Sequence, residues 1–595
     1  MKLSDYLIQY LVDHKVKDVF IVMGGAASHI VDSLGKNTKI RYICMQHEQA
    51  AAMAADVQAR LTGHPSAAVA TSGPGATNLI TGTCTSWFDS IPCIFLTGQV
   101  ALSETKGERK IRQLGFQETD IIEIVKSVTK YAVMVKDPSS IKYHLDKAFY
   151  LAKNGRPGPV WLDLPLNVQH SEINPDSLRG FNPKLEKQGS QKLKQQVKKT
   201  LELIAKASRP IILAGHGIRI ARAIPEFEKL INALGWPVVS TWNGIDILAH
   251  DDPLYVGQFG VYGARAANFA VQNSDLLISI GSRLDTRQTG NHPESFARAA
   301  KKIAVDIDQA ELAKNWVKID LAVNADAKDF LSQIAKHLKN PEKTRVDGWW
   351  QKIKDWQNKF PVILPEFYKQ KDSVNPYIFI RALSKELNND DIILVDSGAT
   401  TVWTFQAFKV KKGQRLINPL GNFPMGWAIP AGIGAWFATG KKRVICIAGD
   451  GAMQMNIQEL QTIAYHKIPL KIFVINNHSY GIVKQFQDLY FDSRYEGTSY
   501  EKGYSCPDFL KIARDYNLST SHLASNSQIG QKITKCLSSP GPSLCEVLID
   551  DNQKIIPKLA AIKTAKGYVS KPIEDQLPYL KRSVLYENMI IDTIS

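Results

Sequence analysis

The sequence predicts an α/β protein built from three doubly wound parallel-sheet domains. Two observations lead to this fold class. First, a chain of 595 residues is too long for one hydrophobic core, and its length suggests about three or four domains. Second, three long segments alternate short apolar runs with helical patterns, and Gly, Ser or Pro follows the apolar runs, as is typical where parallel strands end.

Strands are expected at the apolar runs of each segment. The first segment has them at 19–23, 67–70, 94–97 and 160–164, the second at 211–214, 238–240, 276–280 and 303–306, and the third at 392–395, 444–447, 472–475 and 544–548. At the N-terminus, Asp5, Asp13 and Asp18 interrupt the apolar residues. This pattern predicts an amphipathic helix that runs into a strand, not a signal peptide.

The segments predict domains at 1–175, 190–340 and 360–550, followed by a C-terminal tail over 551–595. Two stretches between the domains, 175–199 and a second around 339–347, are expected to be linkers, the first because it is rich in Lys, Gln, Ser and Pro. The tail contains basic and proline residues with little periodicity. Two alternatives stay open for it: it closes over an active site, or it is disordered.

Composition narrows the class of function. The net charge of +16 is compatible with a nucleic acid, an anionic membrane or an anionic substrate. No Arg-rich tail, RNA-reading aromatic motif or run of 18 apolar residues accompanies this charge, so we expect a solvated basic surface without a nucleic-acid or membrane partner. The 7 cysteines form no C-x-x-C pair, which is typical of reduced thiols in a cytoplasmic enzyme.

The strongest chemical signal lies in the third segment. An apolar run ends in Gly449, Asp450 and Gly451, a helical pattern follows, and the next apolar run ends at Asn477, 27 residues after Asp450. Glycines let the backbone approach a ligand, and a helix N-terminus favours phosphate. Carboxylate and amide oxygens suit Mg²⁺ shared with a diphosphate. An aspartate or an asparagine in a turn is ordinary when it occurs alone. Together with the two glycines and the interval between the strands, Asp450 and Asn477 indicate a site for a metal ion and a diphosphate. The sequence Asp-Ser-Gly at 396–398, followed by Thr400, fits a diphosphate cradle at another strand end.

These third-segment motifs resemble the thiamine diphosphate (ThDP)-binding motif. The first segment adds further motifs at 24–25, 44–56, 71–78, 89–92 and 97–100. Over roughly residues 1–550 their order resembles the acetolactate synthase (acetohydroxyacid synthase) large, or catalytic, subunit family. The resemblance implies pyrimidine-binding, central and diphosphate-binding domains, with ThDP and Mg²⁺ as cofactors. It also implies a transferase that decarboxylates a 2-keto acid, expected to be pyruvate, and joins the acyl carbanion equivalent to a second carbonyl.

The resemblance also assigns roles to residues. Glu48, which alone would be an ordinary first-turn glutamate, is expected to hydrogen-bond the pyrimidine ring and so promote loss of the thiazolium C2 proton. Gln117 is expected to face the reacting carbonyl. Met425 is expected to wedge the cofactor into a bent shape. The implied catalytic set is Glu48, Gln117 and Gly25. The implied metal ligands are Asp450, Asn477 and the backbone carbonyl of Ser479. The implied cofactor-binding set is Gly73, Asn78, Ser397, Gly398, Thr400, Met425, Gly449, Gly451, Ala452, Asn477, Arg283 and Asp308.

A flavin and a second subunit are also implied. The stretch 277–290 resembles the flavin-contacting segment of the family, with 215–217 and 305–308 at matching strand ends. Arg283 suits either a flavin phosphate or a substrate carboxylate. FAD is therefore expected, with ADP or an empty domain as alternatives; in the family the flavin is not needed for the net reaction. Because Glu48 of one subunit meets the Asp450 site of another in that family, a homodimer or homotetramer is expected.

The sequence departs from the family pattern in the expected acceptor pocket. Leu166 stands where the family usually has a lysine. Phe486 stands where the family has a tryptophan that is associated with larger acceptor keto acids. Ala399–Thr400 and Val261–Tyr262 replace a Gln-His and a Met-His pair. The acceptor therefore stays open.

Four functions remain. They are acetolactate synthase, a pyruvate-using carboligase for another acceptor such as a keto-sugar nucleotide, a flavin-linked pyruvate oxidase, and a catalytically silent regulatory subunit. The intact Glu48, Asp450 and Asn477 argue against the last of these.

Overall fold

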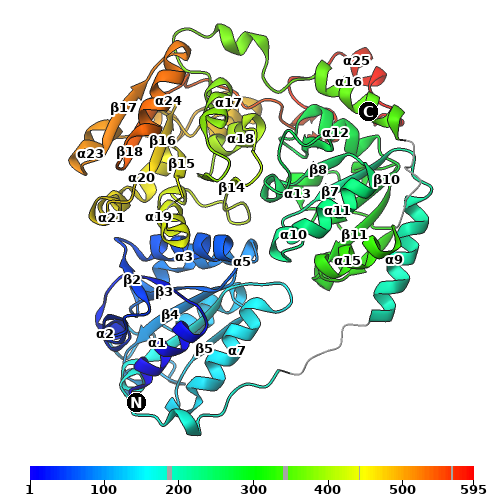
Figure 1. The fold of residues 1–595 in the computed structure, drawn as a ribbon. Helices are drawn as coiled ribbons and strands as arrows, with labels where there is room; N and C mark the ends of the chain where they lie inside the picture. Colours follow the sequence, from blue (N-terminus) through cyan, green and yellow to red (C-terminus); the bar gives the residue numbers. More distant parts are fainter. Residues whose placement is uncertain (184–189, 339–345, 441, 565–566, 595) are drawn as a thin grey trace.

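The computed structural model describes residues 1–183, 190–338, 346–440, 442–564 and 567–594. It contains three six-stranded sheets, each all-parallel and flanked by helices, which confirms the predicted fold class. In Figure 1 the first sheet lies at the lower left in blue and cyan, the second at the right in green, and the third at the upper left in yellow and orange. In such sheets the carboxyl ends of the strands share one edge, where ligands usually bind.

The first sheet has the strand order β2-β1-β3-β4-β6-β5. The predicted N-terminal helix is α1, which buries Leu3, Leu7 and Leu11 and runs into β1. The strands are β1 (Asp18–Ile21), β2 (Arg41–Cys44), β3 (Ser66–Ala70), β4 (Cys93–Gln99), β5 (Tyr131–Met134) and β6 (Val160–Pro165). The helices are α1 (Leu3–Asp13), α2 (Ser28–Lys36), α3 (Glu48–Thr62), α4 (Pro74–Asn78), α5 (Ile80–Phe88), α6 (Ile121–Val125), α7 (Ile141–Lys153) and α8 (Leu166–Gln169).

The second sheet has the order β12-β11-β10-β7-β8-β9. Its strands are β7 (Pro210–Ala214), β8 (Val238–Ser240), β9 (Tyr255–Gln258), β10 (Leu276–Ile280), β11 (Lys301–Asp306) and β12 (Leu321–Asn324). The helices are α9 (Ser190–Ile204), α10 (Gly217–Ile220), α11 (Ile224–Leu234), α12 (Arg265–Gln272), α13 (Thr286–Thr289), α14 (Gln309–Ala313), α15 (Ala327–His337) and α16 (Asp347–Lys359).

The third sheet has the order β14-β13-β15-β16-β18-β17. Its strands are β13 (Ile392–Val395), β14 (Arg415–Ile417), β15 (Val444–Gly449), β16 (Lys471–Asn476), β17 (Ser519–Leu523) and β18 (Ser543–Leu548). The helices are α17 (Pro376–Glu386), α18 (Ala399–Ala407), α19 (Ala428–Thr439), α20 (Asp450–Met455), α21 (Leu460–His466), α22 (Gly481–Tyr490), α23 (Phe509–Asp515) and α24 (Ile529–Ser538).

The alanine run of α3 is explained by its packing. Residues 50–55 are fully buried, and α3 lies against α19 of the third sheet. A Cβ at Gly434 of α19 would approach the backbone oxygen of Ala54 to 2.2 Å. Only small side chains permit this close crossing, which joins the first and third sheets in one apolar cluster.

The expected linker at 175–199 is only partly correct, because α9 begins at Ser190. The many lysines and glutamines of this stretch made it look like a linker. Its helix nevertheless has an apolar face that includes Val197 and Ile204, and both side chains are buried in the core of the second sheet. The stretch 339–345 of the second expected linker lies outside the described residues, and α16 begins at Asp347.

The described part of the C-terminal tail is folded, which excludes the disordered alternative for it. It forms the antiparallel strands β19 (Ala561–Thr564) and β20 (Gly567–Ser570) and the helix α25 (Arg582–Glu587). Leu559, Ile573 and Leu585 join the core of the second sheet. The buried Asn268 of α12 donates a hydrogen bond to the carbonyl of Ile573 at 2.8 Å. In Figure 1, α25 lies close to α16.

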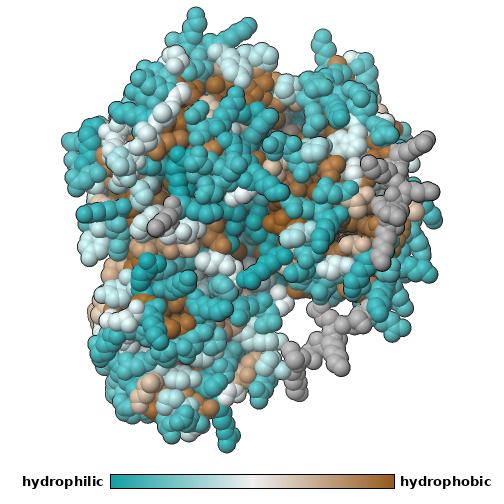
Figure 2. Space-filling view, viewed as in Figure 1, coloured by the Kyte–Doolittle hydropathy of each residue, from teal (hydrophilic) through white to brown (hydrophobic). Residues whose placement is uncertain are grey.

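None of the helices in the described parts of the chain is both long and apolar enough to cross a membrane. Figure 2 shows that hydrophilic residues cover most of the visible face. This view agrees with the interpretation of the basic composition as mostly a solvated surface.

Candidate functional site

The carboxyl ends of β13, β15 and β16 bring the third-segment motifs together. Gly449 at the end of β15 pairs with Ile475 of β16, and Ile447 pairs with Val395 of β13. A Cβ at Gly449 would lie 3.1 Å from the Oγ1 of Thr400, so the start of α18 touches the end of β15. The predicted neighbours therefore share one edge of the sheet.

Asp450 is the most unusual group at this edge. Its side chain is buried, and Oδ1 accepts a hydrogen bond from the backbone N of Gly451 at 2.9 Å. Oδ2 makes no well-formed hydrogen bond among the described residues, and the buried Tyr504 hydroxyl, which also makes none, lies close enough to lower the pKa of Asp450. Burial raises the pKa of Asp450 to about 7. An unpartnered carboxylate oxygen in a buried site lacks a cation or a donor, which is the arrangement a metal ligand needs.

Asn477 and Ser479 follow β16 next to this carboxylate. Both are buried, and the Asn477 amide donates a hydrogen bond to the Ser479 Oγ at 2.8 Å. The backbone carbonyl of Ser479 accepts a hydrogen bond from Gly481 at 2.9 Å. A Cβ at Gly451 would meet the ring of Tyr480 at 2.3 Å, so this position excludes a side chain. Ala452 follows in the first turn of α20 and is buried.

Asp396, which the sequence analysis placed in the diphosphate cradle without a role of its own, organises the neighbouring loop. Its carboxylate accepts hydrogen bonds from the backbone N atoms of Ser397, Gly426 and Ala428, at 2.8, 2.9 and 2.8 Å. Burial raises its pKa to about 6. The Ser397 hydroxyl donates to the carbonyl of Pro424, and Gly398 precedes α18 with a φ of +107°. These bonds fix the loop that carries the half-buried Met425.

Glu48 lies in the first domain at the first turn of α3, as predicted. It is 9% exposed, and its Oε2 accepts a hydrogen bond from the Asn78 amide at 3.0 Å. A Cβ at Gly75 would lie 3.2 Å from Oε1. Glu48 therefore contacts α4, the short helix that follows β3.

Gln117, Gly73 and Gly25 belong to the same group of loops. Gly73 has a φ of +62°, and a Cβ there would come within 3.0 Å of the Gln117 backbone oxygen. Gln117 itself is exposed and has a φ of +64°. Gly25 is exposed, and the next residue, Ala26, donates a backbone hydrogen bond to Thr71 at 3.1 Å. The structure thus brings the predicted catalytic residues to one edge of the first sheet.

Within the single chain, the backbone N of Gln46, two residues before Glu48, donates a hydrogen bond to the Glu459 carboxylate of the third domain at 3.0 Å. Among the described residues, no hydrogen bond or ion pair links Glu48 with Asp450 or Asn477. Large apolar side chains are exposed beside both groups: Phe116 is 86% exposed near the first group, and Phe486 is 47% exposed on α22. Exposed aromatic residues around a polar site are typical of a surface that another protein surface covers.

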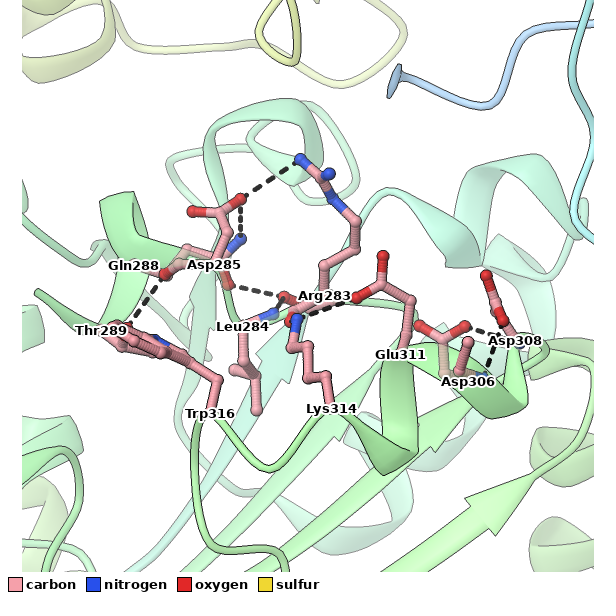
Figure 3. A network of polar contacts seen from close by, with 12 residues as sticks. Arg283, Leu284, Asp285, Gln288, Thr289, Asp306, Asp308, Glu311, Lys314 and Trp316 are labelled. Carbon is pink, nitrogen blue, oxygen red and sulfur yellow. Dashed lines mark hydrogen bonds and ion pairs between the residues drawn. The ribbon is translucent and has the colours of Figure 1, made fainter. Parts of the chain in front are cut away.

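Arg283 and Asp308, from the second sheet, form a third group (Figure 3). Arg283 pairs with Asp285 at 3.4 Å, and Lys314 donates to the Arg283 carbonyl. Asp308 caps α14 through the backbone N of Ala310 at 2.9 Å. Its other oxygen accepts from Arg156 of the first domain at 3.0 Å. Both oxygens of Asp308 are therefore already engaged.

Two adjoining cavities lie beside this third group. One has a volume of about 190 Å³ and is lined by His216, Gly217 and Asp306, among others. The other has a volume of about 550 Å³ and is lined by Phe88 and Asp308, among others. Arg156, Arg283 and Ile307 line both.

No cluster of three or more His, Cys, Asp or Glu side chains suited to a metal ion occurs among the described residues. A metal at Asp450 would therefore need the amide and carbonyl oxygens that surround it.

Three family models match the chain. "Thiamine pyrophosphate enzyme, N-terminal TPP binding domain" matches residues 1–124, "Thiamine pyrophosphate enzyme, central domain" matches 197–334, and "Thiamine pyrophosphate enzyme, C-terminal TPP binding domain" matches 396–547.

Relatives match along nearly the whole length. The "Acetolactate synthase large subunit" of Cyanidium caldarium is 36% identical, over 94% of this chain and 95% of the relative. The "Probable acetolactate synthase large subunit" of Methanocaldococcus jannaschii is 36% identical, over 92% of each chain. The "Acetolactate synthase 2, chloroplastic" of Nicotiana tabacum is 33% identical, over 96% of this chain and 85% of the relative.

Proposed function

The chain belongs to the family of thiamine pyrophosphate enzymes that includes the acetolactate synthase large subunits, and from this membership we propose that it is a ThDP- and Mg²⁺-dependent carboligase. It decarboxylates a 2-keto acid, in the first place pyruvate, and transfers the acyl group to a second carbonyl compound. The ranges 1–175, 190–340 and 360–550 are its three domains in this proposal, and its free cysteines are in keeping with a cytoplasmic enzyme.

The observation that carries the proposal is the unpartnered Oδ2 of buried Asp450. A cation would satisfy this carboxylate, and Asn477 and the Ser479 carbonyl supply further oxygen ligands of the kind that Mg²⁺ takes. Gly449, Gly451 and Ala452 would let a diphosphate approach the N-terminus of α20 closely, where the Gly451 N–H already bonds the Asp450 carboxylate. Ser397, Gly398 and Thr400 would hold it from the end of β13. These residues fit the metal and the diphosphate.

When bound, ThDP supplies an acidic carbon that attacks the 2-keto acid and holds the electron pair left by CO₂. The side chains of the protein prepare this chemistry. Glu48 offers its Oε1 to the cofactor while Asn78 holds Oε2 in place. Met425 would press on the cofactor between its two rings. The Gln117 amide and the Gly25 backbone would face the reacting carbonyl, where a hydrogen-bond donor stabilises developing negative charge.

A complete site in this proposal contains two chains. Glu48 comes from one copy and Asp450 from the other, so the unit is a homodimer or a homotetramer. The exposed Phe116 and Phe486 support this arrangement, because a second chain could cover them.

We further propose FAD in the cavities that Arg283 lines. Arg283 and Arg156 carry guanidinium groups suited to a phosphate. The shared lining of the 190 and 550 Å³ cavities supports an elongated ligand that extends through both. Asp308 would then exchange one of its present partners for the ligand.

A second candidate function is a carboligase with an anionic acceptor such as a keto-sugar nucleotide. The observation that favours it is Lys558, which is 5% exposed and has no hydrogen-bond or ion-pair partner for its ammonium among the described residues. Burial, with repulsion from Arg287 and Lys554, lowers the pKa of Lys558 to about 8. An acceptor with an additional negative charge would neutralise this group.

The test is to incubate the protein with ThDP, Mg²⁺, FAD and pyruvate, and to measure CO₂, acetolactate and flavin reduction. We expect one CO₂ per acetolactate. CO₂ release only after a keto-sugar nucleotide is added would favour the second candidate. Flavin reduction would indicate a pyruvate oxidase, and the absence of turnover with every donor would overturn the enzymatic proposal.

A further inference from the structure

A buried glutamate of the third domain holds the segment that leads to Glu48 in the first domain. Glu459 ends the 3-10 helix Ile457–Glu459, which follows α20, and its side chain is fully buried. Its Oε1 accepts a hydrogen bond from the backbone N of Gln46 at 3.0 Å. Gln46 lies in the connection over 45–47 between β2 and α3, and Glu48 is the first residue of α3.

The carboxylate of Glu459 is oriented from within its own domain. The Thr462 hydroxyl donates to its Oε2 at 2.7 Å, and Thr462 is buried as well. Burial raises the pKa of Glu459 to about 7, against hydrogen bonds from Thr462 and from the backbone N atoms of Gln46 and His47, which lower it. One oriented carboxylate therefore bonds two consecutive backbone N–H groups of the other domain.

The connection over 45–47 has few other anchors. The backbone N of Met45 donates to the carbonyl of Ile21 at 2.9 Å, and the His47 side chain accepts from the backbone N of Gln49 at 3.0 Å. The Gln46 side chain is exposed, and its backbone N has no hydrogen-bond partner other than Glu459 among the described residues. Without Glu459 this N–H would be left unpaired unless the connection moved toward water.

The segment that carries Glu459 is itself held in place. Asn456, which is buried at the end of α20, donates to the carbonyl of Gly426 at 2.7 Å. Its amide nitrogen also lies 3.7 Å from the sulfur of Met53 on α3. Glu459 is therefore a fixed reference point for the beginning of α3.

We propose that Glu459 is a positioning residue for Glu48. By holding the backbone of the connection over 45–47, it sets where the first turn of α3 begins, and so where the Glu48 Oε1 points while Asn78 holds Oε2. The inference rests on the proposed role of Glu48 at the pyrimidine ring. Because a misplacement of about 1 Å can cost about 10²-fold in rate, a contact two residues away controls turnover without touching the cofactor.

The test compares Glu459→Ala with the wild-type protein. Its kcat with pyruvate is expected to fall by at least about tenfold, because Glu48 is no longer held in place. The KM for pyruvate and the affinities for Mg²⁺ and ThDP are expected to stay within about threefold, since the residues assigned to those ligands form no hydrogen bond with Glu459. In cofactor-free protein, amide hydrogen exchange at Gln46 and His47 is expected to be at least about tenfold faster, as measured by mass spectrometry.

Two further variants separate positioning from general stability. Glu459→Gln keeps a carbonyl oxygen for the Gln46 N–H and is expected to retain at least about a third of the wild-type kcat. Asp275→Ala is the matched control. At the amino end of β10, the Asp275 carboxylate likewise accepts from two consecutive backbone N atoms, those of Ser208 and Arg209, at 2.8 and 2.9 Å. Its loss is expected to lower the thermal unfolding temperature but to leave kcat within about twofold of wild type.

The double variant Glu459→Ala/Glu48→Gln shows whether Glu459 acts through Glu48. Its kcat is expected to lie within about twofold of that of Glu48→Gln alone, so a further tenfold loss would overturn the inference. A wild-type kcat in Glu459→Ala, or an equal loss in Asp275→Ala, would overturn it while leaving the role of Glu48 intact. Weakened Mg²⁺ or ThDP binding in Glu459→Ala would assign Glu459 to the Asp450 site and overturn it as well. Near wild-type turnover in Glu48→Gln would remove the role of Glu48 and this inference together.

Discussion

Replacing Glu48 by glutamine is expected to lower turnover with pyruvate by about 10²–10⁴-fold, the usual range for a lost acid–base partner. Glutamine keeps the shape of the side chain and can still accept the Asn78 hydrogen bond, so the position of α4 against Glu48 is retained. It cannot carry the negative charge that the cofactor's pyrimidine ring needs. The measurement is kcat at saturating ThDP, together with ThDP affinity and thermal unfolding.

The matched control for this variant is Glu123→Gln in the same domain. Glu123 is exposed on α6, and its one ion pair among the described residues is with Lys126, at 3.6 Å. Its substitution is expected to leave turnover within about twofold of wild type, as for most surface changes. If Glu48→Gln kept near wild-type turnover, the assigned role of Glu48 would be wrong.

The second large effect is expected from Asp450→Asn. Substitution of a residue that only hydrogen-bonds a metal ligand typically lowers metal affinity by about 10–100-fold. Loss of the ligand itself is therefore expected to weaken Mg²⁺ binding by at least about 100-fold. ThDP should then dissociate from the variant, as it should from wild-type protein in excess EDTA. The measurement is ThDP retained after gel filtration with and without EDTA. Full retention in EDTA would refute the metal assignment.

The pH dependence of this site follows from Asp450. Burial raises its pKa from 3.8 to about 7 in the metal-free fold. The neutral acid therefore stabilises the fold at low pH, and this contribution is lost as the pH rises from about 4 through 7. Metal-free Asp450→Asn should be at least as stable as wild type at about pH 8. In wild type, the Mg²⁺ concentration for half-maximal activity should rise by up to about tenfold per pH unit below 7, because only the carboxylate binds metal.

The sequence predicted the central strands of every sheet and missed the edges. In each sheet the four expected strands are the four inner ones. The two outermost strands of each sheet were not expected. They are β2 and β5 in the first sheet, β12 and β9 in the second, and β14 and β17 in the third. Inner strands are covered on both faces and give continuous apolar runs. Of the edge strands, β2 exposes Arg41, Tyr42 and Cys44 and β5 is half-buried throughout, so the apolar signal is diluted.

The sequence predicted those residues of the candidate site that lie within a few positions of a strand end. Asp450, Asn477 and Glu48 stand where the motifs placed them. The organising role of Asp396 was missed because its partners, Gly426 and Ala428, are about 30 residues away in sequence. These residues bind Asp396 through their backbone N atoms, so the type of their side chains does not reveal the contact.

The most direct test of the two-chain site is complementation between inactive variants. Glu48→Gln and Asp450→Asn chains are co-expressed with different tags, and the mixed oligomers are purified and assayed with pyruvate. A mixed dimer has one site with both groups intact and one with neither, so its expected activity is about half that of a wild-type dimer. Activity no higher than that of either variant alone would contradict the account, since it would mean that the two residues act within one chain or do not act together.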